Sequence, residues 1–528
     1  MKQQTTTTLK TTINWMGISW LILVILSIVF FFIAIGFIAF PPKYILPLGI
    51  CLLIIDVLMG YFSLKKRKKV SYKKKSVKKI VVIIINCILS ILLFTGSIYL
   101  PILQAQMKGI FVEPTDSTQE VKINAYVMTS EYKSAHTDIF PDTSTSTNLE
   151  DYKDKKFITQ STVDKDNQAY AVEDIKKQLN VSSINTIAEQ SNVSAASALY
   201  NGVGDVMLMN ANYEASFADI EGYEHFSTDT QVLYTVVISV KVEKKADTIQ
   251  NYTNTSFSVF IAGSDSRDSQ LTYYTRTDVD MILTVDPVNK QILLVSIPRD
   301  WYVKNPALGN GYDKLTHLGN DGMQNTIDGL NQEFSFDYIK NYFEVNFVTF
   351  KNIVDAIGGV DINNTYAFST DVYNFSEGQI HLSGDEALEY VRERHNLANG
   401  DYGRNEHQAM VLQAIISKIS SKEIISNFNN LLNNLQGNFL TSLSSEDIYS
   451  LAKMQLNDGG KWSFVSYHLG GQGDYNSTAS MGDQQLYVSY PFESQVKFAN
   501  EQITNVMNGQ IITQGSLPDD DQTVYLPN

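Results

Sequence analysis

Cysteine is nearly absent from this 528-residue chain, which contains only Cys51 and Cys87. Both lie within long apolar runs, so the remainder of the chain must be stable without disulfides. This excludes a small disulfide-stapled secreted domain. A chain of this length is instead expected to form two or more domains, each with its own core.

Histidine is sparse and arranged without pattern. No two of the seven histidines share the spacing of zinc ligands, which argues against a zinc site. We expect His395 and His407 to be supporting or surface groups rather than metal ligands. No nucleophile-elbow motif and no Ser/His pairing is present, so serine-nucleophile chemistry has no support either.

Three long apolar runs occupy residues 15–40, 44–64 and 80–104. Each reaches the roughly 20 residues that cross a bilayer, and no cleavage site follows the first, so residues 1–104 are predicted to be an uncleaved anchor. The loop 65–79 carries ten Lys or Arg residues, and basic loops stay in the cytoplasm. A multi-pass protein of the cell membrane is predicted, with a cytoplasmic N-terminus and everything after about residue 104 extracytoplasmic.

The predicted external part is strongly acidic. It holds 28 basic and 55 acidic residues, a net charge of −27. Such a surface repels polyanions, so no nucleic-acid partner is expected. A phosphate site in this part would need its positive charge concentrated in one place.

Composition divides the external part into segments. Residues 105–248 contain no arginine and are predicted to form a small α+β accessory domain, with a structural or partner-docking role as the default. A polar linker at 249–256 precedes a second domain at 257–511. Residues 512–528 are predicted to be a mobile tail.

The second domain mixes short apolar runs with amphipathic segments. The runs at 257–263, 280–286 and 291–297 are typical of buried strands. Helices are expected at 349–357, before two glycines, and at 383–394, where Ser383 and Glu386 form a capping box, with a longer one starting near Arg404. This pattern predicts an α/β fold with a mixed central sheet and helices on both faces.

Arginine is scarce: lysine supplies 34 of the 41 basic residues and arginine only seven. Beyond residue 104 every arginine falls in the second domain, near predicted strand ends or helix termini: Arg267, Arg276, Arg299, Arg392, Arg394 and Arg404. The planar guanidinium grips a carboxylate or phosphate at two points, which lysine cannot do. We interpret the set as a phosphate site, with unrelated salt bridges as the alternative.

Two aspartates accompany the first of these arginines. Asp265 follows a predicted strand in GSDSR, and Asp278 precedes the next strand in RTD. Magnesium typically takes one or two carboxylates together with phosphate oxygens and water. The sequence therefore predicts a Mg²⁺ site at Asp265 and Asp278, with Mn²⁺ as the alternative ion.

Several spaced motifs resemble, in order, the signature blocks of the LytR-CpsA-Psr family. They are GSDSR, RTD, SIPRD (296–300), GGVDI (358–362), GQIHLSGDEALEYVRERH (378–395) and GDYGRNEHQ (400–408). The resemblance covers about residues 257–425 well. Three spans and an accessory domain are similar to the streptococcal capsule-linked CpsA branch.

The resemblance implies an αβα sandwich that acts outside the membrane of a Gram-positive bacterium. Family members transfer a glycopolymer, capsular or teichoic-acid-like, from undecaprenyl pyrophosphate to peptidoglycan through a phosphodiester, and other capsule-assembly membrane proteins are expected partners. Carried over by position, Asp265 and Asp278 hold the metal, and Asp278, Arg276 and Arg299 are catalytic. Pyrophosphate binding falls to Arg267, Arg276, Arg299, Lys314, Arg392, Arg394, Arg404 and Gln408. His407 stands where many relatives have arginine, which leaves the charge at that position open.

Other functions remain as alternatives. A polyprenyl-pyrophosphate phosphatase or pyrophosphatase would use the same site, whereas a glycopolymer-binding or sensing module would need the arginines but hardly a metal pair. A non-catalytic regulator is a further alternative. The extracytoplasmic location argues against a DNA-binding regulator. For the polyprenyl chain, an apolar groove is expected from residues in 349–357 and 411–419, for which plain core packing is the alternative.

Overall fold

The computed structural model describes residues 14–36, 44–64, 72–110, 118–241, 251–264, 271–397, 400–421 and 438–518. The chain divides into two compact units. One contains the described residues of 1–109 and 448–459, and the other those of 110–447 and 460–528.

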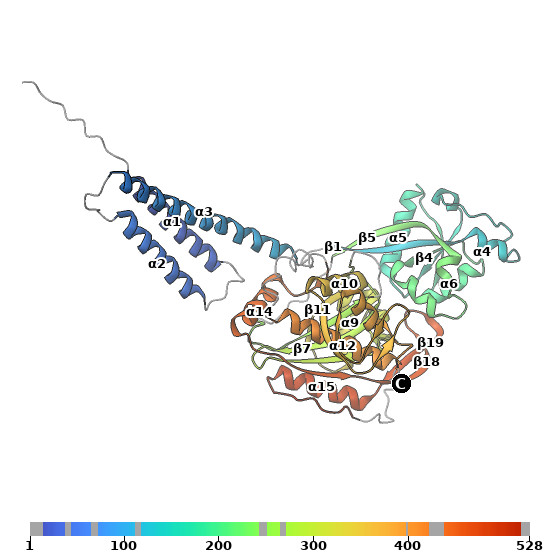
Figure 1. Cartoon of the computed structure of the whole chain (residues 1–528). Helices are drawn as coiled ribbons and strands as arrows, with labels where there is room; N and C mark the ends of the chain where they lie inside the picture. Colours follow the sequence, from blue (N-terminus) through green and yellow to red (C-terminus); the bar gives the residue numbers. More distant parts are fainter. Residues whose placement is uncertain are drawn as a thin grey trace, which may run out of the picture. The chain divides into compact units, whose positions relative to one another are not determined.

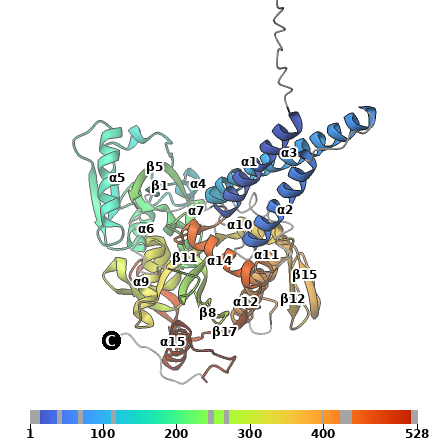
Figure 2. The same cartoon turned by 90° about the vertical axis from the view of Figure 1, so that its left-hand side faces the viewer.

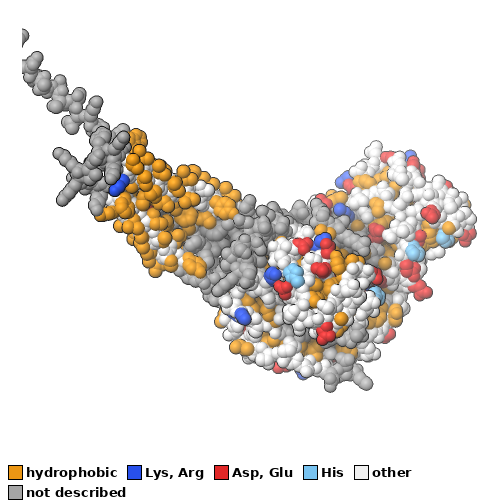
Figure 3. Space-filling view, in the orientation of Figure 1, with side chains coloured by type: hydrophobic (Ala, Val, Ile, Leu, Met, Phe, Trp, Pro, Cys, Tyr) orange, Lys and Arg blue, Asp and Glu red, His pale blue; other side chains and the backbone are white. Residues whose placement is uncertain are grey.

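The predicted apolar spans are confirmed as helices. They are α1 (Trp15–Gly36), α2 (Ile45–Leu64) and α3 (Tyr72–Ile110). Each contains a stretch long and apolar enough to cross a membrane, and hydrophobic side chains cover much of their described surface (Figure 3). Polar side chains join the helices: Ser27 donates to Asp56 at 3.0 Å, and Asn86 donates to Ser19 at 3.0 Å and Ser63 at 3.3 Å. Apolar surfaces facing out and paired polar groups facing in fit a membrane anchor.

The accessory segment forms a five-stranded sheet of order β3-β2-β4-β1-β5 with helices packed on both faces (Figure 1). Its strands are β1 (Thr118–Met128), β2 (Lys156–Gln160), β3 (Asn185–Glu189), β4 (Val206–Asn210) and β5 (Thr230–Lys241). Its helical elements are α4 (Ser130–Ala135), η2 (Leu149–Tyr152), α5 (Lys165–Gln178), α6 (Asn192–Tyr200), η3 (Ala211–Asp219) and α7 (Phe226–Asp229). Alternate residues of β1 serve different cores: Ile123 packs with Ile175 of α5, and Tyr126 packs with Leu199 of α6. The α+β architecture expected for this segment is confirmed.

A six-stranded mixed sheet of order β16-β11-β6-β7-β8-β17 forms the centre of the second domain. Its strands are β6 (Phe257–Ser264), β7 (Thr277–Asp286), β8 (Gln291–Ile297), β11 (Ile339–Asn346), β16 (Leu440–Thr441) and β17 (Ser463–His468). β6, β7 and β8 form an antiparallel meander, whereas β11 runs parallel to β6 and β17 parallel to β8. The three predicted strands are β6, β7 and β8, but β7 begins at Thr277, three residues before the apolar run. Its polar start belongs to the sheet because Thr277 pairs with Ser264.

Helices cover both faces of this sheet, as predicted. On one face Ile282 and Leu293 pack in a core with residues of α9 and α15, and on the other Met281 and Leu294 pack against Ala409 of α12. The helices of this domain are α8 (Leu315–Leu318), α9 (Met323–Glu333), α10 (Phe347–Ala356), α11 (Gly384–Arg392), α12 (Gly400–Ile419) and α15 (Glu493–Met507). A further helix, α14 (Ser445–Asp458), belongs for most of its length to the other compact unit. The small strands are β9 (Tyr302–Asn305), β10 (Gly311–Lys314), β12 (Val360–Asn364), β13 (Phe368–Ser369), β14 (Asn374–Phe375), β15 (Gly378–Leu382), β18 (Gly471–Thr478) and β19 (Gly482–Pro491). The β12–β15 ribbon lies beside α12 (Figure 2).

The ends of α10 and α11 lie largely where the sequence predicts them. The Ser383 hydroxyl accepts from the Glu386 N–H while the Glu386 carboxylate accepts from the Ser383 N–H, which is the predicted capping box. α10 stops before Gly358 and Gly359, whose φ angles are 77° and 74°. α11 ends at Arg392 rather than at residue 394, because Glu393 is already extended, so Arg394 lies just beyond the helix.

The first part of the predicted tail lies against the sheet. Gln514 accepts from the Ser466 N–H at 3.0 Å and donates to its carbonyl at 3.0 Å, and Ile512 and Leu517 pack against the main core. Residues 519–528 lie outside the described residues.

The accessory domain and the second domain share buried contacts. Met481 and Leu486, from the β18–β19 ribbon, are buried in the same apolar cluster as accessory residues of α6 and η3. Asn192 of α6 donates to the Ser480 carbonyl at 3.1 Å. Tyr213 of η3 donates to the carboxylate of Asp321 at 3.1 Å. A buried apolar contact flanked by hydrogen bonds therefore joins the accessory domain to the second domain.

The contact at Asp321 predicts a pH dependence of stability. Burial, reinforced by the charges of Asp164 and Asp313 and opposed by hydrogen bonds from Asn305 and Tyr213, raises the pKa of Asp321 to about 7. Between the ordinary aspartate pKa and this value the folded protein binds more protons than the unfolded chain, so stability falls as pH rises. Asp164, whose pKa is also raised by burial, acts in the same direction.

We expect the melting temperature of the full chain to fall from pH 5 to pH 8 and the fall to be smaller in Asp321→Asn. Each kcal/mol lost lowers the melting temperature by about 2–4 °C in a domain of 150–250 residues, which a thermal scan resolves. Asp337→Asn, at a residue whose side chain is 69% exposed, is the control and should behave as wild type. A pH dependence equally steep in Asp321→Asn would contradict the assignment.

Candidate functional site

Several strand ends that carry the predicted residues meet at one edge of the central sheet. Ser264, the last residue of β6, pairs with Thr277 at the start of β7 and with Asn346 at the end of β11. Asp278 follows Thr277, and Arg299 follows the end of β8. Asp265 and Arg267 come directly after β6 in the sequence but lie outside the described residues.

Ion pairs connect four side chains at this edge. Arg299 Nη1 lies 2.6 Å from Asp278 Oδ1, and Arg299 Nε lies 3.7 Å from Asp300 Oδ2. Lys314 Nζ lies 2.6 Å from Asp300 Oδ1. The structure therefore brings Asp278, Arg299 and Lys314 together through Asp300, a residue of the SIPRD motif that sequence reasoning did not single out.

Burial makes this pairing necessary. Desolvation by itself would lower the pKa of Arg299, but Asp278 and Asp300 raise it above its ordinary value. Desolvation by itself would raise the pKa of Asp300, but Lys314 and Arg299 hold it below its ordinary value. Arg299 and Asp300 are therefore both kept in their charged forms by their neighbours.

Two buried carboxyl groups lie further into the sheet from this edge. Asp280 of β7 and Glu344 of β11 both pair with Ala262 of β6, so they lie on the same face of the sheet on either side of a small residue. Burial raises the pKa of Asp280 to about 8 and that of Glu344 well above its ordinary value. The hydroxyls of Thr277 and Ser264 lie close enough to favour ionisation, but no oxygen of either carboxyl group accepts a well-formed hydrogen bond within the described part of the chain. The sequence analysis identified neither Asp280 nor Glu344, although an acidic residue at an inward-facing position of an apolar strand is a signal of a buried carboxyl group.

Arg276 points to a different neighbour. Its Nη1 donates to the Ala215 carbonyl at 3.3 Å and lies 3.7 Å from Asp219 Oδ2, both in η3 of the accessory domain. Asp278, in contrast, pairs with Arg299.

Arg392 reaches the same sheet edge from α11. Its guanidinium carbon lies 4.5 Å from the centre of the Phe347 ring, and Phe347 directly follows Asn346 at the end of β11. Glu389 lies 3.7 Å from Arg392 Nη1. Arg394 is exposed, and its Nε donates to His395 Nε2 at 3.3 Å.

The direction of α12 places Arg404 at this edge too. Ala409 packs with Met281, whereas Ile416 lies near Ile292, the residue that pairs with Val285 at the far end of β7. The helix therefore runs from the Asp278 end of β7 toward its other end, and Arg404 precedes Ala409 by more than one turn. Arg276, Arg299, Arg392 and Arg404 thus come to this edge from separate segments of the chain.

His407 and Gln408 bind the end of α11 instead of facing solvent. His407 Nδ1 donates to the Tyr390 carbonyl at 3.2 Å, and Gln408 Nε2 donates to the Val391 carbonyl at 3.3 Å. Burial lowers the pKa of His407 to about 4, and its ring stacks on Tyr390 at 4.1 Å between centres. The position whose charge the sequence left open is therefore neutral, and His407 supports the arginine-bearing segment, as expected.

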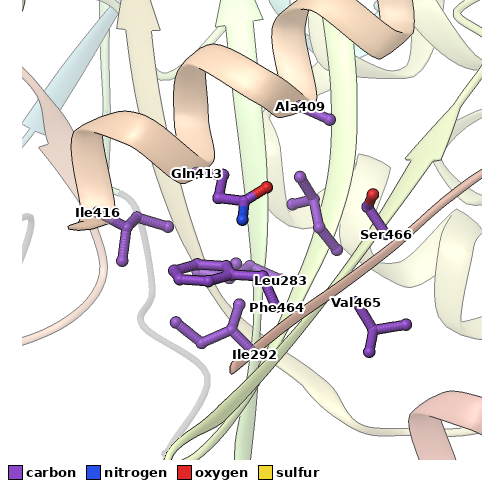
Figure 4. A pocket seen from close by; sticks show the side chains of 9 residues that line it. Leu283, Ile292, Ala409, Gln413, Ile416, Phe464, Val465 and Ser466 are labelled. Carbon is purple, nitrogen blue, oxygen red and sulfur yellow. The ribbon is translucent and has the colours of Figure 1, made fainter. Parts of the chain in front are cut away.

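An apolar pocket lies between α12 and the sheet (Figure 4). Its lining residues are Leu283, Ile292, Leu294, Ala409, Gln413, Ile416, Phe464, Val465 and Ser466. The free space is about 10 Å³, room for roughly one water molecule. Of the two segments expected to form an apolar groove, 411–419 contributes Gln413 and Ile416 to the pocket lining, and 349–357 contributes no lining residue.

The predicted metal pair is only partly placed. Asp278 is 21% exposed at the sheet edge, within reach of a ligand, whereas Asp265 lies outside the described residues. Among the described residues no group of three or more His, Cys, Asp or Glu side chains could hold an ion. A hard cation that takes one or two carboxylates and completes its shell with phosphate oxygens and water still fits this donor set.

The family model of the LytR_cpsA_psr family matches residues 225–489, about half of the chain. The polyisoprenyl-teichoic acid–peptidoglycan teichoic acid transferase TagU of Enterococcus faecalis is 37% identical over 196 residues, which cover 37% of this chain and 64% of that protein. TagU of Bacillus subtilis is 37% identical over 198 residues, covering 37% and 62%. The chain thus spans less than two thirds of the length of these curated relatives. The crystal structure of B. subtilis TagU, at 28% identity, aligns with 49% of this chain and 100% of its own, with a TM-score of 0.38.

We expect Arg392→Lys and Arg394→Lys each to weaken binding of a polyprenyl pyrophosphate although both keep the charge. Lysine loses the two-point grip, and a loss of about 1.4 kcal/mol corresponds to about tenfold in Kd. Titration calorimetry of the full chain in detergent measures this, with Arg67→Lys, in the predicted cytoplasmic loop, as the matched control. An unchanged Kd in both variants would contradict the interpretation of these arginines as a phosphate site.

Proposed function

Because this chain belongs to the LytR-CpsA-Psr family, we propose that it is an extracytoplasmic phosphotransferase. It moves a glycopolymer, teichoic-acid-like or capsular, from undecaprenyl pyrophosphate to peptidoglycan, forms a phosphodiester and releases undecaprenyl phosphate. The observation that carries the proposal is the chain of ion pairs from Asp278 through Arg299 and Asp300 to Lys314. The curated relatives named as teichoic acid transferases support the same reaction class.

Phosphoryl transfer needs alignment and positive charge more than covalent help from the protein. The two cations and two carboxylates of the ion-paired chain compensate one another, so they fix geometry without adding net charge. The further guanidinium groups that bind the pyrophosphate in this proposal are those of Arg276, Arg392, Arg394, Arg404 and, by sequence, Arg267. Gln408 and His407 act by holding the end of α11 beside them.

Asp265 and Asp278 would hold Mg²⁺, or Mn²⁺ in its place. When bound there, the ion would supply charge neutralisation on the transferring group. Asp278 is suited to this because Arg299 keeps its carboxylate oriented while part of the side chain stays exposed. Asp278 could alternatively accept the proton of the acceptor hydroxyl.

The pocket under α12 is the proposed site of the polyprenyl chain. Seven of its nine lining residues are apolar, and one of them, Ala409, follows Arg404 on the same helix. Its present free space is far smaller than a prenyl chain, so binding requires α12 to shift from the sheet. The long apolar leaving group would then lie against β7, β8 and β17 with its phosphate at the edge.

We predict that Asp278→Ala abolishes transfer while the protein stays folded. Loss of a metal ligand removes charge neutralisation, and loss of a general base typically costs about 10²–10⁴-fold. The measurement is transfer of a labelled lipid-linked glycan to peptidoglycan by the full chain, with a melting curve. A metal ligand's loss raises the Mg²⁺ requirement, and a base's loss does not.

Asp337→Ala, which removes an exposed acid of the same domain, is the matched control and should transfer normally. Near-normal turnover in a well-folded Asp278→Ala protein would refute the mechanism.

A further inference from the structure

We propose that Asp219 and the Ala215 carbonyl, in the accessory-domain segment η3, are positioning residues that hold Arg276 for pyrophosphate binding. The inference rests on the proposed function, because it concerns an arginine of that site. It assigns the accessory domain a role in the reaction.

The contact engages one arm of the guanidinium. Both the 3.3 Å hydrogen bond to Ala215 and the 3.7 Å ion pair with Asp219 are made by Nη1. The Arg276 side chain is only 11% exposed, so its direction is set by what surrounds it. Its backbone is fixed as well, since Thr277 pairs with Ser264 at the site edge. Because the guanidinium is planar, these contacts at Nη1 restrict the orientation of the whole group.

The segment that makes the contact is itself anchored. Tyr213 and Phe217 of η3 are fully buried, and Phe217 stacks on Phe226 at 4.4 Å between ring centres. The Asn210 side chain caps the start of η3 by accepting from the Asn212 N–H at 3.1 Å. Asp219, two residues after Phe217, is therefore carried by a rigid element rather than by a loose loop.

Docking of the two domains fixes this element relative to Arg276. Tyr213 bonds Asp321 of the second domain, and Met481 of the β18–β19 ribbon is wholly buried in the cluster that includes Phe217. The same buried contacts that join the domains thus set the distance between Asp219 and Arg276.

The strength of the contact favours orientation over inhibition. The Asp219 side chain is 50% exposed and lies at 3.7 Å, and ion pairs of this kind change an equilibrium only a few-fold. A pyrophosphate, which carries more charge, displaces such a partner easily. A weak, well-placed partner can still restrict the rotamers of an unliganded arginine, and its loss then raises the ordering cost of binding.

The test is a double-mutant cycle read out by the Kd of the full chain in detergent for farnesyl pyrophosphate and by kcat and KM for transfer. We expect Asp219→Asn to raise Kd and KM by 2- to 5-fold with little change in kcat, and Asp219→Glu, which keeps the charge, to restore binding to within 2-fold. Glu221→Gln removes a charge from an exposed residue two positions away and should change nothing. In an Arg276→Gln background, Asp219→Asn should have no further effect on Kd.

Each other result has one meaning. Tighter binding or faster transfer by Asp219→Asn would show an inhibitory contact, and an effect that persists in Arg276→Gln would show a general electrostatic effect; either overturns the proposal, as does no effect at all. If wild type binds farnesyl pyrophosphate and Arg276→Gln binds equally well, Arg276 is not part of the site and the positioning role falls with it. If wild type does not bind the probe, the proposed function itself fails.

Discussion

Charge compensation around Arg299 is the constraint on which the site depends. Its side chain is only 18% exposed, and it stays charged there because Asp278 and Asp300 pair with it. The backbone beside it is equally restrained, since the fully buried Trp301 donates to the Gly470 carbonyl at 2.9 Å and the Arg299 carbonyl accepts from Thr316 at 2.9 Å. A guanidinium fixed on both sides can meet a phosphate without first being ordered, which is how a site gains from preorganisation.

The sheet turns distant motifs into one site. β6, β7 and β11 end or begin at the same edge, so Ser264, Thr277 and Asn346 become neighbours although about 80 residues of sequence separate the first from the last. Helices then bring in two further arginines: α11 lays Arg392 over Phe347, and α12 runs along β7 with Arg404 at the edge. The accessory domain adds a contact from a third direction, through η3 to Arg276.

Much of this followed from the sequence where the signal was local. The buried strands β6 to β8, the capping box at Ser383 and the glycine stop after α10 depend on neighbours a few residues apart, and the structure has them all. What the sequence could not give was which arginine meets which acid: Asp300 pairs with Lys314 and Arg276 with Asp219, pairs fixed only by tertiary packing. The neutral state of His407 depends on burial among Tyr390 and its neighbours, which no short motif records. The metal pair of Asp265 and Asp278 and the domain boundaries stay predictions.

The fate of the lipid phosphates tests the central claim most directly. The full chain would be incubated with a doubly labelled polyprenyl-pyrophosphate glycan and peptidoglycan, and the lipid, polymer and inorganic products would be separated and counted. The proposed phosphotransfer predicts one polyprenyl monophosphate released for each glycan attached, with the second phosphate retained in a phosphodiester to the wall. Release of polyprenyl monophosphate together with a free glycan phosphate, without attachment to peptidoglycan, would contradict this account and identify a pyrophosphate hydrolase instead.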